Sequence, residues 1–132
     1  MATAKELVQT VVNNGVTVAT INEPQLTGDA IAEKLRQQLL GLVTEGGARK
    51  IAVDLQHVKY MASAAFRPFL SLNRKLQEVK GQVVLCNLSP IVRTIFEQMR
   101  LISSNPLYHA TFDTQADVAA AVAFLNQEKP PR

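Results

Sequence analysis

The chain has 132 residues, of which 47% are hydrophobic and 19% charged, and its net charge is +3. This balance is typical of one globular domain that buries its own core, and it excludes a disordered chain. The 14 Lys and Arg residues are scattered and 5% of residues are aromatic, so the basic, aromatic-rich surface of a nucleic-acid-binding protein is not expected.

The first half of the chain predicts a hairpin, a helix and a buried strand. Asn13-Asn14-Gly15 separates two runs rich in β-branched residues, which predicts antiparallel strands joined by a tight turn. A loop containing Pro24 follows, and then apolar residues at helical spacing, with Thr27 or Asp29 as the N-cap and Gly46-Gly47 as the end. The expected bounds are strands at 7–12 and 16–21, a helix over about 31–43 and a strand at 50–55.

The second half continues the alternation. Gly81 is expected to end the second helix, and Ser89-Pro90 to begin a shorter third helix, because proline in the first turn costs no hydrogen bond. Thr114 or Asp113 is the expected cap of the last helix. The expected bounds are a helix over about 66–79, a strand at 82–87, a helix over about 90–99, a strand at 107–112 and a helix from 116 to about 126.

The predicted element order is β-β-α-β-α-β-α-β-α, which indicates an α/β fold. Strands that alternate with helices predict a mixed, mostly parallel sheet of about four to five strands with about four helices and right-handed crossovers. No linker or internal repeat divides the chain. We expect one domain over residues 1–132, with its core at about 7–126 and a frayed tail at 127–132.

Cysteine content and apolar runs bear on the cellular compartment. Cys86 is the only cysteine, so no intrachain disulfide can form, and its apolar surroundings predict a buried, inert thiol. The N-terminal residues do not resemble a signal peptide, and the longest apolar run, 118–125, is too short to span a bilayer. We expect a cytoplasmic protein without membrane insertion.

Enzyme and metal signatures are weak. His57 and His109 lack neighbouring ligands, so neither a metal site nor a cofactor is predicted. Asp54 ends a strand and is expected to be buried, accepting N–H bonds from the following loop. A triad of Ser63, His57 and Asp54 can be written on paper, but no Gly-x-Ser-x-Gly turn surrounds the serine. The sequence therefore favours a binding protein over an enzyme.

Ser63 lies at a junction of strand, loop and helix, among alanines. A serine there is typical of a helix N-cap. The same position suits a phosphate, because a helix N-terminus stabilises an anion. Small neighbours leave the hydroxyl reachable, so phosphorylation would turn a neutral contact surface into a repulsive one. Both roles stay open from the residues alone.

The segment from Asp54 to Phe66 resembles the signature of the STAS family of anti-sigma factor antagonists. In that signature a strand ending in D-L-S leads through a V-x-Y-M-D-S-S/A-G-L loop into a helix. A second match is N-L-S-P-x-V, found here from Asn87 to Val92, and the resemblance covers about residues 7–126. The residues that match the first motif are Asp54, Leu55, Val58, Tyr60, Met61, Ser63, Ala64 and Phe66.

The resemblance implies a single STAS-type domain that binds an anti-sigma factor/serine protein kinase or another regulatory protein, with Ser63 as the phosphorylation site. It also implies that Asp54 and Tyr60 shape the switch loop, and that a docking face combines residues 24–28 with the start of the second helix. The implied partner-binding residues are Pro24, Gln25, Leu26, Ala62, Ser63, Ala64, Ala65 and Arg67.

Two residues depart from the family signature, and the G-x-L-D motif that usually follows the second strand has no clear counterpart in residues 22–28, which contain Pro24. Ala62 replaces the motif aspartate beside the acceptor hydroxyl, and Ala65 replaces the motif glycine. Pro68 would remove a hydrogen bond if Ser63 capped the helix, so the helix is expected to begin late or to kink. The alternatives are therefore a STAS scaffold or transporter-accessory subunit that is not phosphorylated, a small-ligand or nucleotide-binding module, and a hydrolase using Ser63. The oligomeric state is left open.

Overall fold

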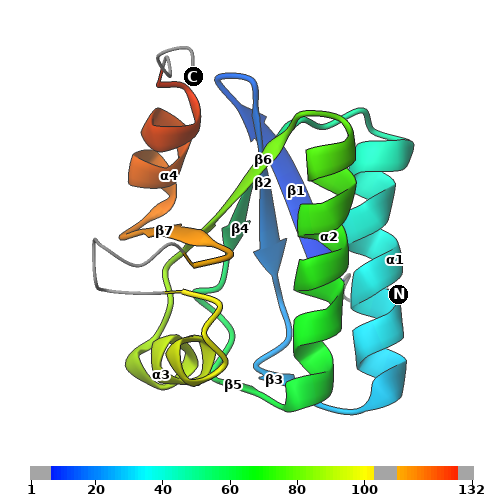
Figure 1. The fold of residues 1–132 in the computed structure, drawn as a ribbon, viewed down its shortest axis with the longest axis vertical. Helices are drawn as coiled ribbons and strands as arrows, with labels where there is room; N and C mark the ends of the chain where they lie inside the picture. The colour runs from blue at the N-terminus through cyan, green and yellow to red at the C-terminus, as the bar shows by residue number, and fades with distance from the viewer. Residues whose placement is uncertain (1–6, 103–109, 128–132) are drawn as a thin grey trace, which may run out of the picture.

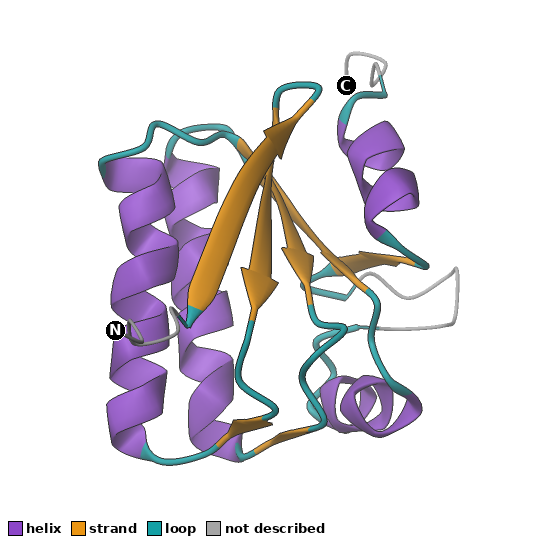
Figure 2. Cartoon of the chain, turned by 180° about the vertical axis from the view of Figure 1, so that it is seen from behind, coloured by secondary structure: helices purple, strands orange, loops and turns teal. Residues whose placement is uncertain are grey.

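The computed structural model describes residues 7–102 and 110–127, so most of the predicted tail at 127–132 lies outside it. A five-stranded sheet with the order β1-β2-β4-β6-β7 forms the centre (Figures 1 and 2). The elements in chain order are β1 (Val8–Asn13), β2 (Val16–Ile21), β3 (Gln25–Leu26), α1 (Asp29–Thr44), β4 (Lys50–Asp54), β5 (Tyr60–Met61), the short 3₁₀ helix η1 (Ser63–Ala65), α2 (Phe66–Glu78), β6 (Gln82–Cys86), α3 (Pro90–Gln98), β7 (Asp113–Gln115) and α4 (Val118–Leu125).

The predicted mixed and mostly parallel sheet is confirmed. Strand β1 pairs with β2 in antiparallel register, whereas the pairs β2–β4, β4–β6 and β6–β7 are parallel. The hairpin turns at Asn14 and Gly15, whose φ angles of 51° and 80° are those that Asn-Gly tolerates. The sequence therefore specifies the edge of the sheet locally, while crossover helices set the order of its parallel strands.

Helices cover both faces of the sheet. Figure 1 shows α1 and α2 side by side against one face and α4 across the other. Alternate residues of β4 divide between these layers, since Ile51 and Val53 pack in the larger core cluster with α1 and α2 while Ala52 packs with α4. A strand that is buried on both faces has a continuous run of apolar residues in its sequence, and β4 and β6 could be predicted because each contains such a run.

The last predicted strand is wrong in position. The structure places β7 at Asp113–Gln115, and Phe112 lies just before it with 3% exposure. The Phe112 ring meets Phe96 edge-on at 6.4 Å, so it fills the core below the sheet instead of joining the ladder. The remainder of the predicted range, including Leu107, lies within 103–109, outside the described residues.

Two predicted helix caps are also corrected. Asp113 and Thr114 belong to β7, so Asp117 caps α4 instead, accepting a 2.8 Å hydrogen bond from the amide of Ala120. Helix α1 begins after Gly28, at φ 87°, without a side-chain cap from Thr27 or Asp29. The Ser89 cap of α3 is confirmed, because its hydroxyl accepts from the amide of Val92 at 3.2 Å.

Candidate functional site: the Ser63 loop

Ser63 is exposed at the start of η1, between β5 and α2. The expectation that Ser63 caps the helix is wrong, since the N-cap of α2 is Ala65 and no side chain caps either helical segment. The late start predicted from Pro68 is confirmed: α2 begins at Phe66, which makes Pro68 its third residue. Amides in the first turn have no acceptor within the helix, so proline removes no bond there. Ser63 is therefore an exposed residue whose side chain does not cap a helix.

A short parallel pairing holds this loop beside the loop that follows β2. Residues Gln25 and Leu26 of β3 pair with Tyr60 and Met61 of β5. The carbonyl oxygen of Pro24 accepts from the amides of Lys59 and Tyr60 at 2.7 and 3.1 Å. These backbone bonds hold residues 24–26, which belong to the predicted docking face, beside residues 59–61, which precede Ser63. The sequence did not predict the pairing, because each strand has only two residues.

Apolar side chains anchor the loop from below. Val58, Met61 and Phe66 are at most 3% exposed and belong to the larger core cluster. The Phe66 ring meets Phe96 of α3 edge-on, with ring centres 4.9 Å apart. Three apolar matches to the signature therefore act as anchors, which limits the freedom of the residues between them.

Asp54 organises the strand ends behind the loop. Its side chain is buried, as predicted, at 2% exposure. Its Oδ1 accepts from the Gln56 amide and from Asn87 Nδ2, both at 3.0 Å, and its Oδ2 accepts from Gln56 Nε2 at 2.8 Å and Thr20 Oγ1 at 3.3 Å. The carboxylate thus ties together the ends of β2, β4 and β6. Sequence reasoning missed Thr20, Gln56 and Asn87 as its partners, although Asn87 begins the second motif.

Comparison with known proteins decides the family. The model of the STAS domain matches residues 8–118. The chain belongs to the STAS domain family. A curated relative, BtrV of Bordetella bronchiseptica, is named as a candidate anti-sigma factor antagonist; it is 34% identical over 99 residues, which are 75% of this chain and 79% of BtrV.

Solved structures share this fold. A candidate anti-sigma factor antagonist from Thermotoga maritima superposes with a TM-score of 0.75 at 12% identity, covering 91% of this chain and 95% of that one. The phosphorylated form of SpoIIAA, a Bacillus cell fate determinant, gives 0.56 at 22% identity, covering 70% of this chain and 82% of SpoIIAA. At these identities the likeness establishes a STAS fold.

The implied partner-binding residues of this STAS domain divide by exposure. Leu26 and Ala65 are buried, at 0% and 2%, so the expectation that their side chains meet a partner is corrected. Leu26 is buried in β3 while its neighbour Gln25 is exposed, and Ala65, the last residue of η1, belongs to the larger core cluster. Ala62 and Ala64 are half-buried. The exposed members are Pro24, Gln25, Ser63 and Arg67.

The catalytic triad that could be written from Ser63, His57 and Asp54 is not assembled in the structure. In residues 7–102 and 110–127, no hydrogen bond joins Asp54, His57 or Ser63 to another of the three, and His57 is exposed. His109 lies outside the described residues. Within those residues, no group of three His, Cys, Asp or Glu side chains could hold a metal ion. No helix in the described ranges is long and apolar enough to cross a membrane.

Cys86 is buried at the end of β6, as predicted, with its Sγ 3.5 Å from the carbonyl oxygen of Val53. Burial, together with the nearby carboxylates of Asp54 and Asp117, raises the pKa of the Cys86 thiol to about 12, and burial is the largest of these causes. A neutral buried thiol is a poor nucleophile. Cys86 thus belongs to the packing of the sheet rather than to the exposed site.

Proposed function

We propose that this STAS domain is an anti-sigma factor antagonist-like regulator acting in the cytoplasm. It binds an anti-sigma factor with serine kinase activity through the surface formed by Pro24, Gln25, Ala62, Ala64 and Arg67, with Ser63 at the centre. The observation that carries the proposal is that Ser63 is exposed at the start of η1, close in sequence to the β3–β5 pairing that holds Pro24 and Gln25 nearby. The name of the relative BtrV supports the choice of partner class.

In the proposed reaction this chain accepts a phosphoryl group on Ser63. The Ser63 oxygen attacks the γ-phosphorus of ATP held by the kinase, the bond from that phosphorus to the β–γ bridging oxygen breaks, and ADP leaves. The hydroxyl proton passes to a base of the kinase. The chain itself supplies no catalytic group and no cofactor.

Phosphorylation at Ser63 would switch the surface electrostatically. The phosphate adds a charge of about −1.5 to −2 where small side chains and a neutral hydroxyl now face solvent. The N-terminus of α2 begins at Phe66, three residues on, and its dipole favours an anion nearby. The phosphate is therefore tolerated by the domain while it repels a partner whose contact surface fits the neutral form.

Incubation with the anti-sigma kinase of the same genome and ATP, followed by intact-mass measurement, tests the switch. We expect the mass of one added phosphoryl group in the wild-type chain and none in Ser63→Ala. A wild-type chain that gains no phosphoryl group, or a Ser63→Ala chain that still gains one, would contradict this role for Ser63.

A second candidate is a STAS scaffold that binds its partner but is not phosphorylated. Ala62 favours it, because this position lacks the carboxylate that the family signature places beside the acceptor hydroxyl. Stable binding to the kinase without mass gain would select this candidate. The transporter-accessory and ligand-binding alternatives stay predictions.

A further inference from the structure

The outward faces of α1 and α2 enclose an open groove of about 590 Å³, which shares only Arg67 with the proposed Ser63 surface. Both helices run alongside each other on one face of the sheet (Figure 1). The α2 side of the groove includes Arg67, Leu70 and Arg74, a spacing that repeats at three and four residues and so places one stripe on one helix face. All three side chains are exposed, so the groove opens to solvent.

The groove carries more cations than carboxylates. Arg36, Arg67, Arg74 and Lys75 line it together with two acidic residues, Glu33 and Glu78. Both carboxylates are already paired: Glu33 accepts from Arg36 at 3.1 Å and Glu78 from Lys75 at 3.4 Å. The positive charges of Arg67 and Arg74 are therefore not paired with either carboxylate of the groove.

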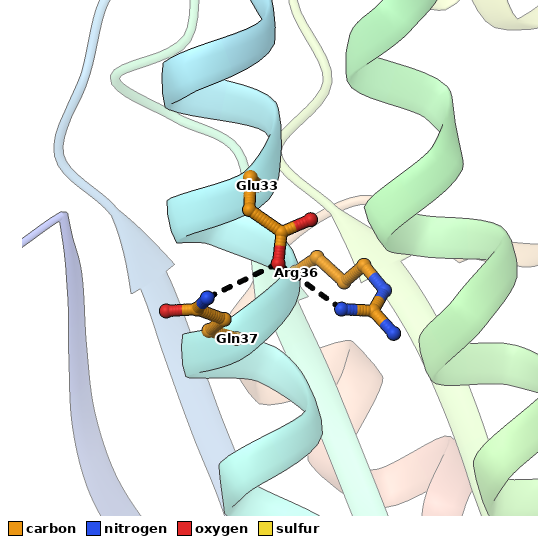
Figure 3. Close-up of polar contacts among 3 residues, drawn as sticks. All are labelled: Glu33, Arg36 and Gln37. Atoms are coloured by element: carbon orange, nitrogen blue, oxygen red, sulfur yellow. Dashed lines mark hydrogen bonds and ion pairs between the residues drawn. The ribbon is translucent and has the colours of Figure 1, made fainter.

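The hydrogen bonds of Glu33 hold the Arg36 side chain in the groove. Figure 3 shows the Glu33 carboxylate holding Arg36 on one side and Gln37 on the other, with the Arg36 side chain extended from α1 toward α2. Across the groove, Arg67 and Arg74 make no ion pair with any described residue. An arginine without a partner offers its full fork of donors to an incoming carboxylate.

The spacing of the two arginines selects the kind of ligand. They lie seven positions apart on α2, which is about 10 Å along the axis and nearly the same angle around it. That spacing matches carboxylates two turns apart on a second helix, so each arginine can pair with a carboxylate of its own. Leu70, 41% exposed, lies between the arginines and offers an apolar contact.

We propose that this groove binds an acidic amphipathic helix of a protein partner. Two carboxylates of that helix pair with Arg67 and Arg74, and an apolar side chain between them packs on Leu70. The proposal deepens the proposed function, on which it rests for the protein nature of the occupant. Arg67 lies one helical turn beyond Ser63, so a partner on the Ser63 surface reaches the groove along α2.

The test uses a synthetic helix as the probe and requires neither kinase nor ATP. A blocked peptide of about 18 residues, long enough to form a helix, carries Glu at positions seven apart and Leu between them. It is titrated into the ¹⁵N-labelled full chain while amide shifts are recorded. We expect saturable binding with shift changes along α1 and α2, and binding at least about tenfold weaker when Gln replaces Glu.

Matched charge reversals separate the groove from general attraction. The double variant Arg67→Glu/Arg74→Glu is expected to weaken binding at least about tenfold. The double variant Lys34→Glu/Arg49→Glu makes the same change in net charge at exposed cations outside the groove, and is expected to change binding less than about twofold. Far-UV circular dichroism and Arg67→Ala/Arg74→Ala check that loss of binding does not reflect loss of fold.

Equal weakening by both charge reversals, shift changes away from α1 and α2, or no saturable binding would overturn the proposal. Equal binding of a single-stranded oligonucleotide, which lacks an apolar helix face, would also overturn it in favour of generic anion attraction. Failure of this test with Ser63 still phosphorylated by the kinase would leave the proposed function standing, so the two failures are distinguishable.

Discussion

The backbone amide of Ala62 donates a hydrogen bond to the carbonyl oxygen of Leu26 at 2.9 Å. This bond continues the β3–β5 pairing by one residue and joins the loop after β2 to the loop after β4. The exposed Gln25 lies in this small sheet and the exposed Ser63 follows directly after it, so the two loops are not independent. A partner that reads this surface meets a fixed arrangement, which lowers the entropy lost on binding.

Leu26 should be the stability anchor of this small sheet. Its side chain is fully buried, so Leu26→Ala removes packed methyl groups and is expected to lower the free energy of unfolding by about 2–4 kcal/mol. Gln25→Ala, at the exposed neighbouring position, should stay within about 0.5 kcal/mol of wild type. Urea unfolding measures both. Similar losses in the two variants would show that Leu26 is not an anchor.

Asp54→Asn tests the carboxylate that joins three strand ends. An amide presents N–H groups to donors that now face carboxylate oxygens, so bonds from Thr20, Gln56 and Asn87 cannot all be kept. We expect a loss of about 1–3 kcal/mol in the free energy of unfolding. Asp113→Asn, at an exposed position, is the matched control. Equal stability of Asp54→Asn and wild type would contradict the assigned network.

From the buried thiol of Cys86 we predict that the stability of the fold depends on pH in the alkaline range. Because its pKa rises from 9.0 to about 12 on folding, the thiol stays protonated in the native state while that of the unfolded chain ionises. The contribution of the Cys86 thiol to the free energy of unfolding is therefore fully present below pH 9 and is lost as the pH rises from 9 toward 12. Stability in this window should fall more steeply for wild type than for Cys86→Ala. Parallel curves would refute the raised pKa.

Ala62→Asp restores the carboxylate of the family signature. Since it would stand beside the acceptor hydroxyl of Ser63, it can accept the hydroxyl hydrogen bond and orient the oxygen for attack. We expect faster phosphorylation by the anti-sigma kinase than in wild type, measured as the initial rate of mass gain. Ala64→Asp, which adds the same charge on the other side of Ser63, is the control. An equal rate in both variants would indicate a general charge effect.

Local signals explain which parts of the fold could be predicted. Asn14-Gly15 fixes a hairpin through backbone angles alone, and the two-sided burial of β4 and β6 makes each a continuous apolar run. The β3–β5 pair and β7 could not be predicted, because strands of two or three residues carry no period of their own. Their positions follow from tertiary contacts instead.

The candidate site was predictable in part for the same reason. Asp54 and Ser63 could be selected from their places at a strand end and a helix start, with the family signature. The exposure of neighbouring residues was not predictable, because whether Leu26 or Ala65 faces the core depends on the β3–β5 pairing and on η1. The cap role of Ser63 failed since η1 shifts the start of α2 to Phe66.

The most direct test of the central claim is a calorimetric titration of the anti-sigma kinase of the same genome with wild type, Ser63→Glu and Gln77→Glu. Gln77 is exposed in the last turn of α2, so Gln77→Glu adds the same charge away from the Ser63 surface. The account predicts saturable binding by wild type, binding at least about tenfold weaker for Ser63→Glu, and a change below about twofold for Gln77→Glu. Binding by Ser63→Glu as tight as by wild type, or no binding by wild type, would contradict it.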